Sequence, residues 1–191
     1  MPRASAAAAA ETARAVLAAA TRQFAERGFA AVSLDDVAEA AGVTRGAVYH
    51  HFRSKAALFA AVAAACHEEV ANAVVAAAEA AGPEPARQLS AGSHAFVDAI
   101  TNGPAVRILL IDGPAVVGWE EWRRLDEAGS AAHLREALET VGVDEEQVDV
   151  LTVLLSGAMN EAALWLARHP EDDTARERTH RALDRLLGAI I

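Results

Sequence analysis

The sequence has little that would support a disulfide-stapled, strand-rich or membrane-inserted protein. A single cysteine, Cys66, excludes an intramolecular disulfide and a cysteine-based zinc site, and on an alanine-rich helix it is expected to be a buried small hydrophobe. Only 5% of the residues are aromatic, and no alternating β-branched run lies between turn signals, so strands are not expected. No apolar run approaches the length of a membrane span, and the alanine-rich start lacks a leucine-type signal core. A cytoplasmic protein is expected.

What the chain has in abundance is alanine and other apolar residues. With 191 residues, of which 53% are hydrophobic, it is long enough to bury a sizeable core. Alanine is the strongest helix former and permits close helix packing. Glycine and proline punctuate the chain between helical stretches. The sequence therefore predicts an all-α fold of about nine helices.

The net charge of -10 argues against a polyanionic partner until it is divided along the chain. Residues 1–60 carry seven basic and five acidic side chains, a net charge of +2, whereas residues 61–191 carry -12. An acidic body repels DNA and orients a basic head towards it.

Residues 33–52, SLDDVAEAAGVTRGAVYHHF, predict two short helices joined by a tight turn. Ser33 and Asp36 form a capping box that begins the first helix. Gly42 suits the left-handed conformation that ends it, and Thr44 caps the second. Small residues at the contact allow a steep, close crossing. This arrangement is typical of a helix-turn-helix.

The outward face of the second helix carries hydrogen-bond donors and no acid: Arg45, Gly46, Tyr49 and His50. Arg45 lies in its first turn, and Lys55 lies in the first turn of the next helix. A cation at a helix N-terminus opposes the helix dipole and costs a few tenths of a kcal/mol, roughly, on an exposed surface. The placement becomes favourable when a phosphate binds there, which indicates a nucleic-acid interface.

The run GVTRGAVYHHFRSKAALF, residues 42–59, resembles the tetracycline-repressor (TetR) family of bacterial transcription regulators. The resemblance spans about residues 11–70. It implies that four residues hold phosphates, Ser33, Thr44, Tyr49 and Lys55, and that three lie against base edges, Arg45, Gly46 and His50. It also implies a homodimer on a pseudo-palindromic operator, with two reading helices about 34 Å apart.

The expected organisation has three parts: a flexible arm over residues 1–10, a DNA-binding domain over 11–70, and an effector-binding and dimerisation domain over 71–191. A long helix after Lys55 links the last two. The final two helices have apolar stripes wide enough to need a partner, so a four-helix dimer interface is expected. Its residues would be Leu151, Leu155, Ala158, Ala162, Leu183, Leu186 and Leu187. The alternative is that both stripes are the chain's own core.

The resemblance also implies a small-molecule pocket among the middle helices. Candidate lining residues are His67, His94, Phe96, Trp122, Asn160 and Trp165. No metal-ligand spacing, glycine-rich phosphate loop or nucleophile elbow occurs, so neither a metal nor a cofactor is expected.

Together these features predict a ligand-responsive, one-component repressor that binds its operator as a dimer and is released by a small-molecule effector. Two alternatives remain open. One is a ligand-independent DNA-binding or architectural protein on the same scaffold. The other is a small all-α enzyme, which a deep cavity holding paired titratable groups would favour.

Overall fold

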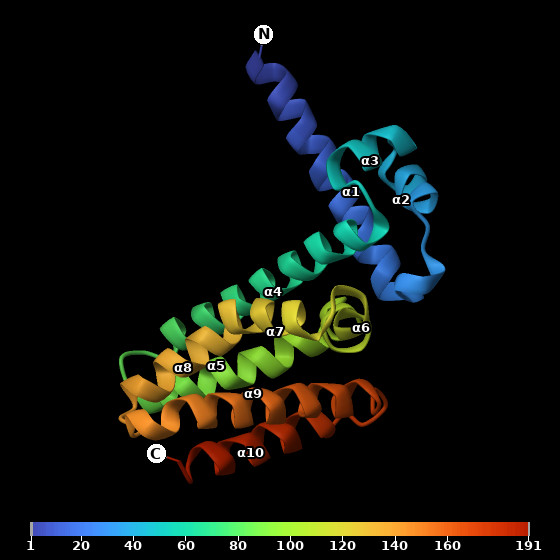
Figure 1. Cartoon of the computed structure of the whole chain (residues 1–191). Helices are drawn as coiled ribbons and strands as arrows, with labels where there is room; N and C mark the ends of the chain where they lie inside the picture. Colours follow the sequence, from blue (N-terminus) through green and yellow to red (C-terminus); the bar gives the residue numbers. More distant parts are fainter. Residues whose placement is uncertain (1, 191) are drawn as a thin grey trace.

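A computed structural model of the chain describes residues 2–190, with side chains described for residues 6–190. It contains ten α-helices and one π-helical segment, and no strand occurs in that part of the chain (Figure 1). In chain order the elements are α1 (Pro2–Ala31), α2 (Leu34–Ala41), α3 (Arg45–Phe52), α4 (Lys55–Ala80), α5 (Pro85–Thr101), η1 (Val106–Asp112), α6 (Gly113–Val117), α7 (Trp119–Ala128), α8 (Ser130–Thr140), α9 (Glu145–Ala167) and α10 (Ala175–Leu187). The predicted all-α fold is confirmed.

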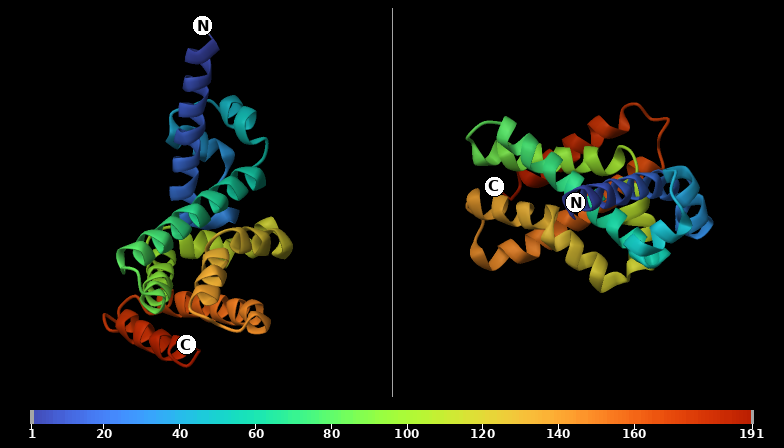
Figure 2. Two further views of the ribbon diagram at one scale, coloured as in Figure 1. Left: turned by 90° about the vertical axis from the view of Figure 1, so that its left-hand side faces the viewer. Right: turned by 90° about the horizontal axis from the view of Figure 1, so that it is seen from above.

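The helices form a small head and a larger body that share α4. The head consists of α1, α2, α3 and the start of α4, whereas α5, η1, α6, α7 and α8 pack against the remainder of α4, and α9 and α10 pack against α5 (Figure 1). The 26 residues of α4 give it a length of about 39 Å. In Figure 2 the head and the pair α9 and α10 lie at opposite ends of the molecule. One helix, α4, therefore connects the predicted helix-turn-helix to the body.

The first helix is longer than its predicted span of about residues 11–27. It begins at Pro2, because the alanine-rich start has high helix propensity. Its axis breaks at Gly28, whose φ of 78° and ψ of 163° are not helical, as the glycine predicted. A flexible arm over residues 1–10 stays a prediction, and Met1 and the side chains of residues 2–5 lie outside the described part.

The sequence predicted one helix from about Trp119 to Val141, and the structure has two, α7 and α8. They separate at Gly129, whose φ of -110° and ψ of -117° leave the helical region. Glycine is a poor helix former, and here it lets the chain turn between two apolar faces. This break and the short helix α6, which directly follows η1, explain why the count exceeds the predicted nine.

The expectation that no helix reaches membrane-spanning length was wrong. Both α4 and α9 are long and apolar enough by length and composition, with mean hydropathies of 1.4 and 1.5 over 18 residues. Half of that window in α4 is buried inside the molecule, as in a core helix, but only 33% of it in α9. The apolar surface of α9 is therefore unusually open.

A cluster of three phenylalanines holds α1 against α4 in the head. The Phe24 and Phe59 rings meet edge to face with centroids 5.2 Å apart, and Phe29 meets Phe59 at 5.3 Å. Val37 of α2 and Val48 of α3 are fully buried and belong to the same apolar core. The reading helices are thus fixed from behind by side chains that the apolar spacing of each helix placed inward.

Candidate nucleic-acid interface and body cavity

The caps that begin and end α2 and α3 are those that the sequence predicted. The Asp36 amide donates to Ser33 Oγ at 3.1 Å, and the Ser33 amide donates to the Asp36 carboxylate at 2.9 Å. Gly42 takes the left-handed conformation, with φ 67° and ψ 30°. The Ala47 amide donates to Thr44 Oγ1 at 3.2 Å. Local hydrogen bonds therefore define the helix-turn-helix.

Four of the seven predicted DNA-binding residues line one cleft of the head, of about 490 Å³: Ser33, Arg45, Tyr49 and Lys55. The cleft lies between the segment 30–35 and the residues from α3 to the start of α4, and Arg53 also lines it. Three cations and one acid, Asp35, therefore line one opening, which leaves a net positive charge there. This geometry suits a strand of sugar-phosphate backbone.

The other three predicted residues, Thr44, Gly46 and His50, are exposed on the turn and on α3. A Cβ at Gly46 would meet only the Thr44 hydroxyl, at 3.8 Å, so the surface there is open. An exposed helix face with little steric cover can enter a DNA major groove. The base-edge roles of Gly46 and His50 stay predictions.

Arg45 is already engaged inside the head. Its guanidinium donates to Asp35 of α2 at 2.9 Å and to the Tyr49 hydroxyl at 3.3 Å, and it lies over the Tyr49 ring at 5.3 Å. The face of α3 by itself carries no acid, but α2 brings Asp35 beside it. DNA would have to compete with this exposed ion pair, which contributes little stability.

Lys55, the only lysine of the chain, has a structural role that the sequence did not reveal. Its ammonium donates to the carbonyl oxygens of Phe29 at 2.7 Å and Val32 at 2.8 Å, and it lies 4.3 Å from the Phe29 ring centroid. These carbonyls lie where the chain leaves α1. Lys55 therefore satisfies acceptors at the end of one helix while it begins another, and a phosphate contact would be an additional role.

We expect Lys55→Met to lower the free energy of unfolding by about 2 kcal/mol, because methionine keeps the apolar stem and leaves partly buried carbonyls without a donor. Urea unfolding followed by circular dichroism measures this. Arg53→Met is the matched control, since Arg53 is an exposed cation in the same cleft for which the structure shows no carbonyl partner. If Lys55→Met, Arg53→Met and the wild type had the same free energy of unfolding, the hydrogen bonds of Lys55 to these carbonyls would not stabilise the fold.

A polar joint fastens the head to the body at Gly28. The Phe29 amide donates to Asp112 Oδ2 at 2.9 Å, and Arg107 reaches the Glu26 carbonyl at 3.5 Å. A Cβ on Gly28 would lie 2.9 Å from the Arg107 guanidinium, and the φ of 78° is one that other residues rarely adopt, so glycine suits this position. Arg107 and Asp112 both belong to η1. The sequence offered one signal for the joint, the glycine at the end of α1.

The comparisons with known proteins cover both parts of the chain. A family model described as "Bacterial regulatory proteins, tetR family" matches residues 16–62, and one described as "Tetracyclin repressor-like, C-terminal domain" matches residues 86–190, more than half of the chain. The chain belongs to the TetR family.

The relatives of this TetR-family chain are similar to it over different lengths. The HTH-type transcriptional regulator TtgR of Pseudomonas putida is 50% identical over 58 residues, which cover 30% of this chain and 28% of TtgR. The chain thus matches these curated relatives over at most 28% of their length. A TetR-family transcriptional regulator from Pectobacterium atrosepticum is 31% identical, with a TM-score of 0.75 and coverage of 97% of this chain and 96% of that one. RolR in complex with resorcinol shares the fold, with a TM-score of 0.68, 20% identity and coverage of 96% and 90%.

The body of this TetR-family chain contains a cavity of about 330 Å³ between α4, α5, α8 and α9. This volume is within the range of small-molecule sites. The lining is mostly apolar and includes Val74, Leu89, Phe96, Leu134 and Met159. Of the six candidates named from the sequence, only Phe96 lines it.

The other five candidates are elsewhere. Trp122 is buried and donates its indole N–H to the Leu109 carbonyl at 2.6 Å. Trp165 stacks on His169 with centroids 4.3 Å apart, and Asn160 has a buried Oδ1 with no hydrogen-bond partner in the described part of the chain. His67 and His94 do not line the cavity either. Their assignment to this cavity is therefore corrected.

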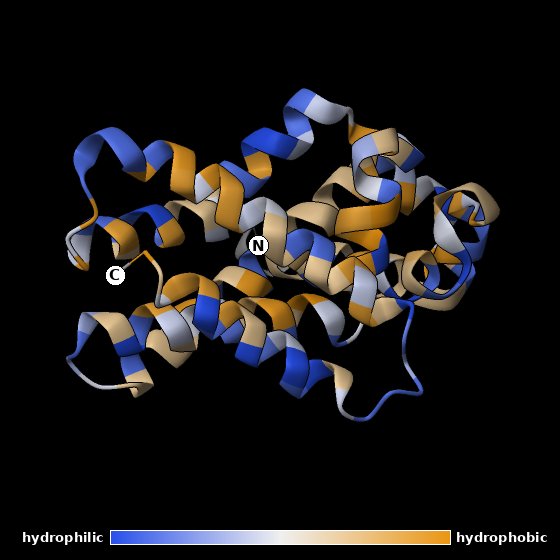
Figure 3. Cartoon of the chain, turned by 90° about the horizontal axis from the view of Figure 1, so that it is seen from below, coloured by the Kyte–Doolittle hydropathy of each residue, from blue (hydrophilic) through white to orange (hydrophobic). Residues whose placement is uncertain are grey.

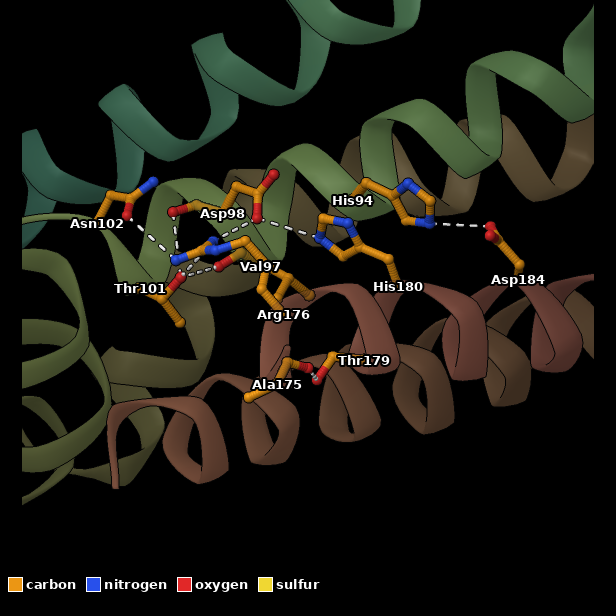
Figure 4. A network of polar contacts seen from close by, with 10 residues as sticks. All are labelled: His94, Val97, Asp98, Thr101, Asn102, Ala175, Arg176, Thr179, His180 and Asp184. Atoms are coloured by element: carbon orange, nitrogen blue, oxygen red, sulfur yellow. Dashed lines mark hydrogen bonds and ion pairs between the residues drawn. The ribbon is translucent and has the colours of Figure 1, made fainter. Parts of the chain in front are cut away.

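His94 belongs to a polar network that fastens α10 to α5 (Figure 4). Its ring stacks on His180, with centroids 4.2 Å apart and planes 6° apart, and its Nε2 lies 2.9 Å from Asp184. His180 Nε2 lies 3.1 Å from Asp98, which also pairs with Arg176. Burial lowers the pKa of His180 despite the neighbouring Asp98. The network fixes the position of α10 and leaves the cavity untouched.

His67 and Cys66 are buried on the inner side of α4. Burial lowers the pKa of His67 to about 4, and burial followed by the charge of Glu69 raises the pKa of the Cys66 thiol to about 12. Cys66 is 3% exposed, so the expected small buried hydrophobe is confirmed. A protonated, buried thiol is a poor redox sensor.

His67 should make the protein sensitive to mild acid. Because its folded pKa lies below the ordinary 6.5, the unfolded chain binds the proton more tightly, so stability is full above 6.5 and falls towards pH 4. From pH 7 to 4.5 we expect His67 to remove about 2 kcal/mol. His67→Gln should flatten that part of the curve in urea titrations at each pH. His180 also has a lowered pKa, so the variant should keep part of the pH dependence of stability, with the same sign. If the slope of stability against pH were the same in the variant and the wild type, His67 would not be its source.

The residues predicted to form the dimer interface fall on two sides of α9 and α10. Leu155, Leu183 and Leu187 are buried within the chain's own core, whereas Leu186 and Ala158 are exposed, and Leu151 and Ala162 are half-buried. The first three are corrected to core residues, because they pack inward against the chain's own helices.

The open side of α9, which shares only Ala158 with the predicted set, is formed by Val150, Val153, Leu154, Gly157 and Ala158 and is here called the α9 face. Three large apolar side chains of this face are more than half exposed: Val150 (60%), Val153 (55%) and Leu154 (62%). Such a cluster of exposed apolar side chains is unusual on the surface of a monomer. Figure 3 views the molecule from the side of α9 and α10, where hydrophobic segments of ribbon are visible. Of the residues predicted for the dimer interface on α9, only Ala158 belongs to the α9 face, and the interface itself stays a prediction.

Proposed function

We propose that this TetR-family chain is a ligand-responsive repressor that binds a pseudo-palindromic operator as a homodimer in the cytoplasm. The observation that carries the proposal is the cleft of the head, where Ser33, Arg45, Tyr49 and Lys55 meet beside the exposed face of α3. Residues 11–70 would be the DNA-binding domain and residues 71–191 the effector-binding and dimerisation domain.

The α9 face supports the homodimer. An exposed apolar strip on a helix at the end of the molecule furthest from the head needs a partner, and small residues at its centre, Gly157 and Ala158, allow close helix contact. A second copy using the same strip would make an isologous four-helix interface with Leu186 of α10 at its edge.

The body cavity supports control by a small molecule. The wall formed by Val74, Val75, Ala78 and Glu79 belongs to α4, the same helix that begins at Lys55 in the head. A ligand that binds better when α4 is displaced would change the spacing of the two heads, and only such a difference in affinity can shift the equilibrium. A 100-fold loss of operator affinity requires about 2.7 kcal/mol of coupling.

The joint at Gly28 offers a second route for this coupling. Asp112 of η1 accepts from the Phe29 amide, and Lys55 donates to the Phe29 carbonyl, so body and head hold the two sides of one residue. A π-helical segment is energetically poor and frequently marks a functional site. A movement of η1 would therefore displace the end of α1 in the head through the hydrogen bond between Asp112 and the Phe29 amide.

We do not propose an enzyme. The titratable groups lining the cavity are Glu79, His133 and Glu136, and no hydrogen bond joins any two of them in the described part of the chain. A catalytic pair would need such a contact. The architectural alternative differs from the proposal only in lacking a ligand response. RolR, with the same fold, was crystallised with resorcinol, which favours a ligand-binding body.

The proposal is tested by fluorescence anisotropy with DNA from the region upstream of the gene that encodes the chain. We expect binding at least about 1,000-fold tighter than to a shuffled sequence of the same length at 150 mM salt. Equal binding to both sequences would remove the proposed function.

A further inference from the structure

The charged side chains that line the body cavity are acidic. Glu79 of α4 and Glu136 of α8 both line it and are exposed, and no lysine or arginine belongs to the lining. Neither carboxylate forms an ion pair within the described residues. The cavity therefore carries two exposed negative charges that no cation among the described side chains pairs with.

The arginines next to lining residues in sequence are bound elsewhere. Arg87 pairs with Glu84 at 2.8 Å, although its neighbour Gln88 lines the cavity. Arg135 pairs with Asp149 and Glu139, each at 2.9 Å, although its neighbour Glu136 lines the cavity. These guanidinium groups are held by acids outside the lining, so they do not compensate Glu79 and Glu136.

The buried end of the cavity has a polar group that lacks a partner. Ser130 is 6% exposed, lines the cavity, and its hydroxyl has no hydrogen-bond partner in the described part of the chain. Ser156, also in the lining, donates to Asp126 at 3.3 Å, so its hydroxyl, unlike that of Ser130, is held by a carboxyl group outside the lining. A buried hydroxyl without a partner is costly, which indicates a bound group that hydrogen-bonds to it.

The lining between these two ends is mostly apolar, with Gln88, Ser93 and His133 as its polar side chains. On α8 it runs from Ser130 to Thr140, about 15 Å along the helix axis. Phe96 and Met159 line it from α5 and α9. An elongated ligand with a hydrophobic body fits this lining better than a compact polar one.

We propose that the cavity binds an amphiphilic organic cation: its positive group lies near Glu79 and Glu136, its largely apolar body extends towards Phe96 and Met159, and a polar group on that body hydrogen-bonds to Ser130. This inference rests on the proposed function, since it names the chemical class of the effector. The negative charge of the body raises the local concentration of cations at the opening and disfavours anions.

The test compares decyltrimethylammonium with decyl sulfate, which share a ten-carbon chain and differ in the sign of the headgroup. Both are titrated into the full chain by calorimetry below their micelle concentrations. We expect the cation to bind at least about tenfold more tightly, as two partly screened ion pairs imply. Equal or tighter binding of decyl sulfate, or no binding of the cation, overturns the proposal.

Two double variants separate the cavity from the overall charge. Glu79→Gln/Glu136→Gln should lower the affinity for the cation about tenfold and should not lower the affinity for decyl sulfate. Glu68→Gln/Glu171→Gln removes the same charge from exposed residues outside the lining and should leave the cation affinity unchanged. If both double variants lost the same amount of affinity for the cation, the preference for cations would come from the net charge of the protein, and the proposed site would be contradicted.

Operator binding of the same proteins, measured without amphiphile, keeps the two proposals distinguishable. Loss of the cation preference with intact operator binding refutes the ligand class alone. A chain that prefers the cation and ignores its upstream DNA refutes the repressor and retains the cation site.

Discussion

A Leu154→Arg variant is expected to sediment as a monomer and to bind a palindromic operator at least about 100-fold more weakly than the wild-type chain. Leu154 is 62% exposed at the centre of the α9 face, so arginine fits the monomer without strain. In the dimer the guanidinium would be buried against its own copy, where two like charges without partners are strongly unfavourable. Sedimentation velocity and operator titration measure the two effects.

The large operator effect follows from the linkage of two heads. Once one head is bound, the other is held at an effective concentration near the millimolar range, which multiplies affinity without new contacts. Ile111→Arg is the matched control, because Ile111 is 55% exposed and lies outside α9. It should remain dimeric. A dimeric Leu154→Arg variant would remove the α9 face from the interface.

Leu155, one residue further, tests something different. It is 5% exposed, so an arginine there would disrupt the core of the single chain before any interface is reached. Leu155→Ala is expected to cost about 2–5 kcal/mol of folding stability through the cavity it leaves. The two neighbouring leucines therefore separate assembly from folding.

Arg45→Ala should cost about 1–3 kcal/mol at each half-site, and a dimer on a symmetric operator should lose about 30-fold or more. Arg45 lies in the first turn of α3 beside the cleft, where the resemblance places it against base edges. The loss should be accompanied by weaker discrimination at particular base pairs, which binding to a library of single-base operator variants would detect.

The ion pair with Asp35 supplies the control for this prediction. Asp35→Asn releases the Arg45 guanidinium and removes a negative charge from the DNA-facing side, so operator affinity should stay equal or increase. If Arg45 served only to hold α2 against α3, both substitutions would weaken binding in the same way. Preserved discrimination in Arg45→Ala would contradict the base-edge assignment.

The head was largely predictable because its determinants are local. The capping box of Ser33 and Asp36, the left-handed Gly42 and the cap at Thr44 each depend on residues within a few positions. The role of Lys55 was not predictable in this way, since its acceptors are the carbonyls of Phe29 and Val32, 26 and 23 residues earlier. A cation at a helix start indicated an unusual partner but not which one.

The body was predictable as helices and not as surfaces. On α9 both sides are apolar, so the pattern could not show that Leu155 faces the core while Leu154 faces outward. The cavity depends on how α8 lies against α4 and α5, which became possible only because the chain breaks at Gly129. A tryptophan suits the wall of a ligand cavity as well as a packed core, so the sequence could not show that Trp122 is buried in the core.

Hydroxyl-radical footprinting of the wild-type chain on its upstream DNA tests the central claim most directly. Two reading heads joined through the α9 face should protect two patches of backbone on one side of the duplex, about 34 Å apart, at the two halves of a pseudo-palindrome. The Leu154→Arg variant should lose both patches at the same protein concentration. A single protected patch, or two patches that persist in that variant, would contradict a dimeric repressor built in this way.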